Sequence, residues 1–166
     1  MASTIRGFAF ALTEGPGCLV KVGNHATPAK GPKLDAAIDS VLVQSRPLFV
    51  AVEHMSGRKQ ERFRHFSEAL EDCCEARQIK LLTVGRDQFE ELAGTRDINK
   101  WLIAQKMAHQ FPEVAHKLPA RRTAWKSEDD RFGIFTALAA AMWMWRSFRR
   151  PPSDPREEVA SSPQTE

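Results

Sequence analysis

The sequence contains little cysteine, with only Cys18, Cys73 and Cys74 among its 166 residues. An odd number of cysteines, two of them adjacent, does not suit a disulfide framework, and their spacing matches no zinc-binding motif. The first residues also lack the pattern of a secretory leader. We therefore expect an intracellular protein in a reducing compartment, with a cytoplasmic location.

Long hydrophobic runs are missing as well. The most apolar segment, from Ile134 to Trp145, is about a dozen residues long and is followed by three arginines. A helix needs about 20 apolar residues to cross a bilayer. We therefore expect no membrane span.

Apolar residues make up 42% of the chain, enough for one globular domain. The last 16 residues are rich in Pro, Ser and Glu and carry too little apolar surface to offset the entropy lost on ordering. We therefore expect one domain over residues 1–150 and a disordered tail over residues 151–166.

The charge is uneven across this boundary. The tail has a net charge of −3, so the formal +3 of the whole chain leaves +6 on the predicted domain. A basic domain suits a polyanionic partner such as nucleic acid, although ordinary soluble domains can have the same balance.

Hydrophobic periodicity predicts an α/β fold. An opening hairpin over 7–12 and 18–22 precedes alternating helices and strands, with buried strands at 48–52 and 79–84. This alternation is typical of a mixed sheet flanked by helices. The predicted helices cover residues 34–42, 59–77, 87–93 and 97–110, and a final helix runs to about Arg149 with Ser127 or Asp129 as its cap.

Two sources of carboxylates lie about 75 residues apart in the sequence. Glu53 ends the strand at 48–52, and Glu128, Asp129 and Asp130 open the final helix. If both meet at one edge of the sheet, they form a metal site of the kind that nucleases use. The alternatives are a solvated glutamate at a strand end and carboxylates that favour the positive end of a helix dipole.

Basic residues flank both acidic segments. They can draw phosphates toward the site, or they can be ordinary solvated positions on helices and loops. The candidates for nucleic-acid contact are Arg58, Lys59 and Arg62 after Glu53, and Arg121, Arg122 and Lys126 before the acidic cluster.

Several short motifs follow one another in an order that can be compared with known families. They are Val52-Glu53, Phe111-Pro112, the basic stretch, the acidic cluster and Ala137-Leu138-Ala139-Ala140-Ala141, preceded near the start by Ala2-Ser3 and Gly7-Phe8-Ala9. This order resembles the RuvC-type Holliday-junction resolvases of the RNase H-like superfamily over about residues 1–145.

The resemblance implies an RNase H-like mixed β-sheet flanked by helices and a Mg²⁺- or Mn²⁺-dependent endonuclease that acts as a homodimer on branched DNA. It adds Ser3 to the nucleic-acid-binding candidates and implies Glu53 and Asp129 as catalytic residues. The implied metal ligands are Glu53, Asp129, Asp130 and Glu128.

The sequence departs from the family pattern at two places. The family's first strand and its catalytic Asp are expected directly before Met1, so the domain is expected to be truncated at its N-terminus. Thr136 stands where the last helix of the family carries an Asp, and a neutral hydroxyl is a weak ligand for Mg²⁺. Asp129, seven residues earlier, is expected on the same helix face as Thr136.

Two hypotheses follow. The first is a RuvC-like, structure-selective endonuclease whose missing Asp is supplied upstream of Met1, with the ion weakly bound if the chain is complete. The second is a non-catalytic RNase H-like remnant that binds nucleic acid or a protein partner through its basic face and the helix that carries Trp143 and Trp145.

Overall fold

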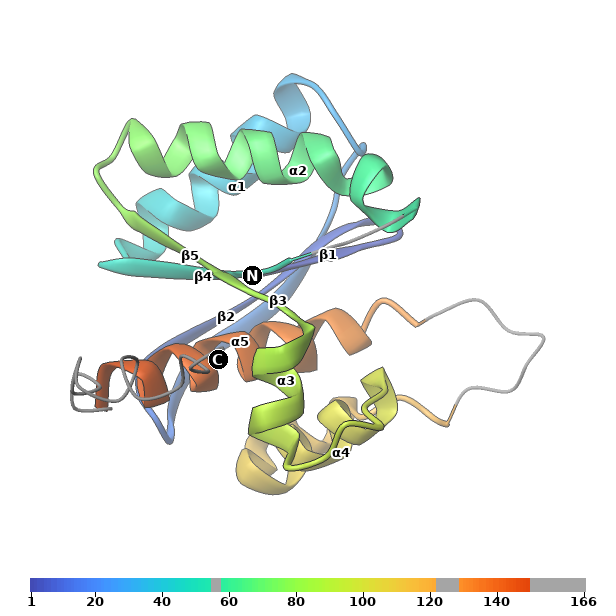
Figure 1. Cartoon of the computed structure of the whole chain (residues 1–166). Coiled ribbons are helices and arrows are strands. Elements are labelled where there is room, and N and C mark those ends of the chain that lie inside the picture. Colours follow the sequence, from blue (N-terminus) through green and yellow to red (C-terminus); the bar gives the residue numbers. More distant parts are fainter. Residues whose placement is uncertain (55–57, 122–128, 150–166) are drawn as a thin grey trace, which may run out of the picture.

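The structure, a computed structural model, describes residues 1–54, 58–121 and 129–149, and for residues 58–62 it describes the backbone only. Within these residues, five strands form two sheets between layers of helices (Figure 1). The first sheet is antiparallel, with the order β1 (Ala2–Thr4), β2 (Gly7–Gly15) and β3 (Cys18–Ala26). The second is a parallel pair, β4 (Phe49–Glu53) and β5 (Lys80–Val84), with Phe49 opposite Lys80.

The backbone of Met1 connects the two sheets. The Met1 amine donates a hydrogen bond to the carbonyl of Ala51, and the Glu53 N–H donates to the carbonyl of Met1 over 3.3 Å. These two bonds flank Val52 in the pattern of a parallel strand pair. The first residue therefore lies between β2 and β4.

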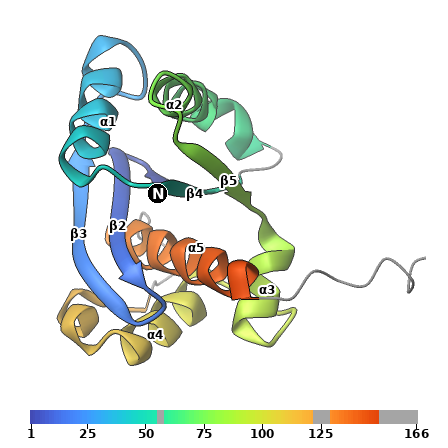
Figure 2. The same cartoon turned by 90° about the vertical axis from the view of Figure 1, so that its left-hand side faces the viewer.

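Helices cover both sides of the strands (Figure 2). α1 (Pro32–Ser45) and α2 (Arg58–Glu75) lie on one side, and α5 (Phe132–Arg149) lies on the other. α3 (Arg86–Ala93), α4 (Lys100–Gln110) and the 3₁₀ helix η1 (Pro112–Lys117) pack on the α5 side, in one hydrophobic cluster with that helix.

The alternation of side chains along β2 creates two cores. Phe8 and Phe10 point toward α1 and α2, where they join Ile38 and Leu70, whereas Ala9 points toward α5. Successive strand residues face opposite sides of a sheet, so one strand supplies both cores. The α5 core is built around Phe135, Leu138, Met107 and Phe111, all of which are almost fully buried.

Two glycines permit close backbone approaches. Gly7 has a φ of 148°, and a Cβ there would lie 1.9 Å from the carbonyl oxygen of His25. At Gly133, a Cβ would lie 2.6 Å from Cγ2 of Thr4 and 2.9 Å from Cβ of Ala9. Gly133 therefore lets the first turn of α5 rest directly on β1 and β2.

The α/β prediction is confirmed, but several element boundaries differ. β1 was not predicted, because three residues are too short for a visible alternation, and both hairpin strands extend beyond their predicted ends. The helix predicted over 97–110 begins at Lys100, because the Asn99 side chain caps it by accepting the Leu102 N–H over 2.9 Å. None of the helices in the described part of the chain is long and apolar enough to cross a membrane.

The predicted position of Asp129 on the last helix is wrong. α5 begins at Phe132, so Asp129 precedes the helix and does not share a helix face with Thr136. Asp129 does help to start the helix, since its carbonyl accepts the Phe132 N–H over 3.0 Å. Ser127 and the predicted tail lie outside the described residues.

Candidate functional site

Glu53 ends β4 beside the Met1 backbone. It is half-buried, and its backbone N–H bonds to Met1. Its negative charge acts on the Met1 amine, but burial has the larger effect and lowers the pKa of that amine from 8.0 to about 5. Glu53 is therefore where the sequence predicts it, at the carboxyl end of a parallel strand.

Asp129 is bound by a neighbouring arginine. Its two carboxylate oxygens accept hydrogen bonds from the Arg131 guanidinium over 2.7 to 3.1 Å, and its Oδ1 also accepts the Arg131 N–H. These bonds hold the pKa of Asp129 below its usual value. Asp130 forms a longer ion pair with Arg6, at 3.7 Å, which links the start of α5 to the turn between β1 and β2.

Thr136 is 2% exposed. Its hydroxyl donates to the carbonyl of Phe132 over 3.1 Å, one turn earlier in α5. This bond satisfies the hydroxyl locally, as is common for Thr inside helices. The Thr136 side chain thus belongs to the core of the protein.

The strand β1 lies beside both acidic segments. The Glu53 N–H bonds to the carbonyl of Met1, the residue just before β1. The first turn of α5 rests on β1 at Gly133, just after Asp129 and Asp130. The fold therefore brings the two sources of carboxylates to the same strand. The third candidate of the acidic cluster, Glu128, lies outside the described residues.

The described residues do not by themselves fit a site for two Mg²⁺ or Mn²⁺ ions, which requires several convergent carboxylates. Both oxygens of Asp129 are bonded to Arg131, and the Thr136 hydroxyl is buried and bonded to the backbone. Within residues 1–54, 58–121 and 129–149, no group of three or more His, Cys, Asp or Glu side chains is placed to hold a metal ion.

The predicted nucleic-acid contacts are only partly described. Arg58, Lys59 and Arg62 lie in the first turns of α2, and Arg121 is exposed. Ser3 is 7% exposed in β1, so its side chain lies inside the protein. Arg122 and Lys126 lie outside the described residues.

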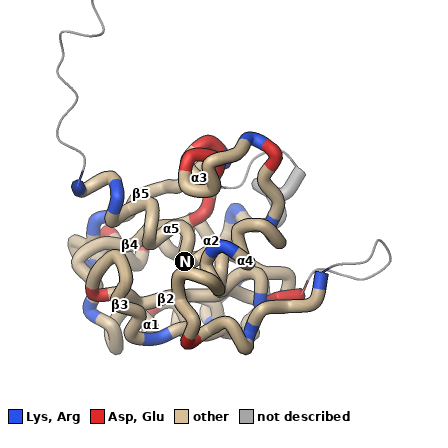
Figure 3. Tube along the Cα trace, turned by 90° about the horizontal axis from the view of Figure 1, so that it is seen from below, with Lys and Arg blue, Asp and Glu red and all other residues tan. Residues whose placement is uncertain are grey.

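Charged residues occur at separate places along the chain and leave most of α5 uncharged (Figure 3). The last turn of α5 is an exception, since it carries Arg146 and Arg149. Arg6 and Arg131 were not predicted as partners of the acidic cluster. The spacing of Arg131, two residues after Asp129, was the available signal for that pair.

Most side chains of α5, the helix that carries Trp143 and Trp145, are too buried to form the predicted surface for a protein partner. Met142 and Met144 are buried, and Trp143 and Trp145 pack partly against the core. The Nε1 of Trp145 donates to the hydroxyl of Thr13 over 3.0 Å, which holds the ring on β2. The exposed aromatic residue of this helix is Phe148, which is 45% exposed and packs against Phe49 with the ring centroids 4.8 Å apart and the ring planes tilted by 54°.

No family model and no curated protein matches this chain in sequence. Its fold, in contrast, matches solved structures. A Thermus thermophilus RuvC structure aligns with 18% identity and a TM-score of 0.57, covering 88% of this chain and 93% of that one. T. thermophilus RuvC in complex with a Holliday junction substrate aligns with 17% identity and a TM-score of 0.55, covering 78% of this chain and 80% of that one. The chain therefore has a RuvC-like, RNase H-like fold.

Proposed function

We propose that this protein binds branched DNA through its RuvC-like fold. The observation that carries the proposal is the similarity over most of the chain to a RuvC bound to a Holliday junction substrate. The formal charge of +6 on residues 1–150 favours a polyanionic partner. Arg58, Lys59 and Arg62 of α2, the helix that follows β4 in the chain, contribute to this charge.

Metal-dependent cleavage of branched DNA is the more specific form of this proposal. It is supported by the position of Glu53 at a strand end beside β1, the strand on which the start of α5 rests. Carboxylates in addition to those described would be needed to hold Mg²⁺ or Mn²⁺, from Glu128 or from residues upstream of Met1. In this form, Glu53 would be a catalytic metal ligand, and Asp129 or Asp130 would have to leave its arginine partner to hold the ion with it.

The alternative is a non-catalytic protein that binds nucleic acid or a protein partner. Two observations favour it over the nuclease. The hydroxyl of Thr136 bonds to the backbone inside the core, and Arg131 occupies the carboxylate of Asp129. A protein of this kind would bind branched DNA equally well with and without Mg²⁺.

One experiment separates the two forms. A labelled four-way junction is incubated with the protein in Mg²⁺ or in EDTA, and both cleavage and retardation on a gel are measured. The nuclease predicts products that require Mg²⁺ and disappear in Glu53→Gln, while binding in EDTA remains. The matched control is Glu113→Gln, an exposed carboxylate in η1, which should cleave normally.

Two results would contradict the nuclease. Cleavage that persists in Glu53→Gln would remove Glu53 from the mechanism. Binding without cleavage in any divalent ion would leave the non-catalytic alternative.

We also propose that the protein acts as a homodimer, since a four-way junction presents two equivalent faces to a symmetric protein. The exposed side chains of Leu48, Phe49 and Phe148 suit an apolar contact between copies. Sedimentation velocity of the wild type and of Phe148→Glu tests this directly. A wild-type monomer at micromolar concentration would exclude a stable dimer.

A further inference from the structure

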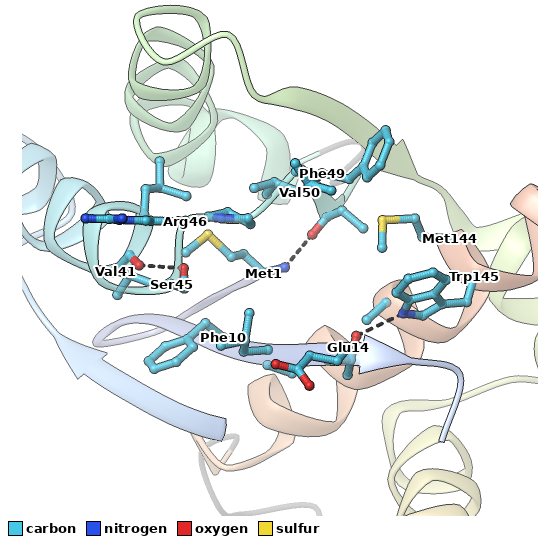
Figure 4. Close-up of a pocket in the computed structure, with 18 residues that line it drawn as sticks. Met1, Phe10, Glu14, Val41, Ser45, Arg46, Phe49, Val50, Met144 and Trp145 are labelled. Atoms are coloured by element: carbon cyan, nitrogen blue, oxygen red, sulfur yellow. Dashed lines mark hydrogen bonds between the residues drawn. The ribbon is translucent and has the colours of Figure 1, made fainter. Parts of the chain in front are cut away.

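The groove beside Met1 does not suit DNA phosphates (Figure 4). It has a volume of about 400 Å³ and is lined mainly by apolar side chains such as Phe10, Val41 and Met144. Its lining includes one positive and one negative side chain, Arg46 and Glu14. Phosphates are bound by exposed positive groups, so the arginines of the outer surface are better candidates for contact with DNA.

Two such arginines lie together at the start of α5. The side chain of Arg6, in the turn between β1 and β2, is 81% exposed and forms an ion pair with Asp130 at 3.7 Å. The side chain of Arg131 is 49% exposed and bonds to Asp129 over 2.7 to 3.1 Å. The two aspartates are consecutive, about 3.8 Å apart at Cα. Both guanidinium groups therefore lie beside one short segment of the chain.

The backbone of both arginines is held in place. The carbonyl of Arg6 accepts the Thr27 N–H over 2.9 Å, and the next residue, Gly7, pairs with Ala26 of β3. The carbonyl of Arg131 accepts the Ile134 N–H over 3.1 Å, in the first turn of α5. A change of partner therefore requires movement of the arginine side chains alone.

The present partners of these arginines can be replaced by phosphate. Ion pairs that are exposed to solvent contribute little, because water screens them. A guanidinium group binds a phosphate through the same pair of N–H groups that bind a carboxylate. A phosphate of DNA also releases condensed counterions when it is neutralised, which a carboxylate of the protein does not. At low salt, the exchange of carboxylate for phosphate is therefore favourable.

We propose that Arg6 and Arg131 bind phosphodiester groups of DNA and that Asp130 and Asp129 compete with the DNA for them. In the free protein, the two aspartates hold the arginines. When DNA binds, its phosphates take the place of the carboxylates. This inference rests on the proposed binding of DNA but not on cleavage, and it makes both aspartates inhibitors of binding.

The test is a double-mutant cycle on the full chain. The affinity for a labelled four-way junction is measured in EDTA by gel retardation. The variants are Asp129→Asn with Asp130→Asn, Arg6→Ala with Arg131→Ala, and the combination of all four changes. Asparagine keeps a side-chain oxygen that can accept the Arg131 N–H, so the start of α5 is preserved. The cycle separates competition for the arginines from the general effect of removing negative charge.

We expect the aspartate changes to raise the affinity by about threefold to tenfold when both arginines are present, and by clearly less when both are alanine. The arginine changes alone should lower the affinity. They should also reduce the magnitude of the salt dependence by about two, one for each lost phosphate contact. An equal gain from the aspartate changes in both backgrounds would overturn the proposal, because the carboxylates would then act by repulsion of DNA alone.

The matched control is the ion pair of Arg86 and Glu90 in α3, which has an N–O distance of 2.9 Å and a similarly exposed arginine. The cycle of Arg86→Ala and Glu90→Gln should show no coupling in the affinity for DNA. Coupling of the same size there would overturn the proposal, because the effect would then not belong to the start of α5. A wild type that does not bind the junction would remove the proposed function itself, whereas binding without coupling would remove the competition alone.

Discussion

The Met1 amine is the most unusual ionisable group in the described part of the chain. Its pKa is lowered to about 5 by burial, while the unfolded chain keeps the ordinary value of 8.0. Between these values, the unfolded chain binds a proton that the folded protein does not bind. In a chain that starts at Met1, the free energy of unfolding should therefore fall by a few kcal/mol as the pH drops from about 8 to about 5.

This pH dependence can be measured by urea denaturation at several pH values. The control is the same chain acetylated at its N-terminus, which has no ionisable amine and should lose most of the slope over this range. Identical slopes in the two forms would show that the amine is not buried in its neutral form.

The ion pair of Asp129 and Arg131 makes a second prediction at single residues. Because Arg131 lowers the pKa of Asp129, the pair contributes stability above the ordinary pKa of Asp129, and this contribution is lost as the pH falls. Arg131→Ala should raise the pKa of Asp129 toward its ordinary value, as measured by NMR titration of the carboxyl carbon. Arg121→Ala, at another exposed arginine, should leave it unchanged.

The stability change in Arg131→Ala should be small, within about 1 kcal/mol, because the pair is exposed to solvent. A pKa of Asp129 that does not respond to Arg131→Ala would contradict the described geometry and leave the carboxylate available to a metal ion.

The contact between α5 and the first sheet depends on Gly133. A Cβ there would overlap with Thr4 and Ala9, neither of which has a long flexible side chain that could move away. Gly133→Val should therefore destabilise the protein by about 1–3 kcal/mol, as is typical of overpacking. The measurement is chemical denaturation of the purified variant.

The matched control is Gly17→Val, because no atom lies within 4 Å of a Cβ at Gly17 in the turn between β2 and β3. This change should stay within about 0.5 kcal/mol of the wild type. If both variants are equally stable, α5 does not rest on β1 and β2 as described.

The sequence predicted individual elements with different success. The 3.6-residue period of Leu34, Ile38, Val41 and Leu42 correctly indicated α1, because the apolar face of that helix is buried. β1 was missed because its three residues are held by pairing with β2, which lies outside any local pattern. The start of α5 was misplaced because the acidic cluster also satisfies the rules for a helix start.

The candidate site was predicted in part. The end of a buried strand correctly located Glu53, since strand ends are readable from hydrophobic runs. The pairing of Asp129 with Arg131 and of Asp130 with Arg6 depends on side-chain geometry and, for Arg6, on a contact far along the chain.

At the level of the whole molecule, the fold and the basic charge lead to a prediction about salt. Lysines and arginines that contact phosphates release counterions, so the logarithm of the affinity for DNA should fall linearly with the logarithm of the salt concentration. If the Arg121 side chain contacts a phosphate, Arg121→Ala should weaken binding. It should also reduce the magnitude of this slope by about one, the value for one lost phosphate contact. A variant with an unchanged slope would place Arg121 outside the interface.

The most direct test of the central claim is a competition for binding in EDTA. A labelled four-way junction is bound by the protein, and unlabelled junction or unlabelled linear duplex of the same sequence and length is added. Protein that binds branched DNA through its RuvC-like fold should be displaced by the unlabelled junction at concentrations at least tenfold lower than by the duplex. Equal competition by the two DNAs, or no binding to the junction at low salt, would contradict the account.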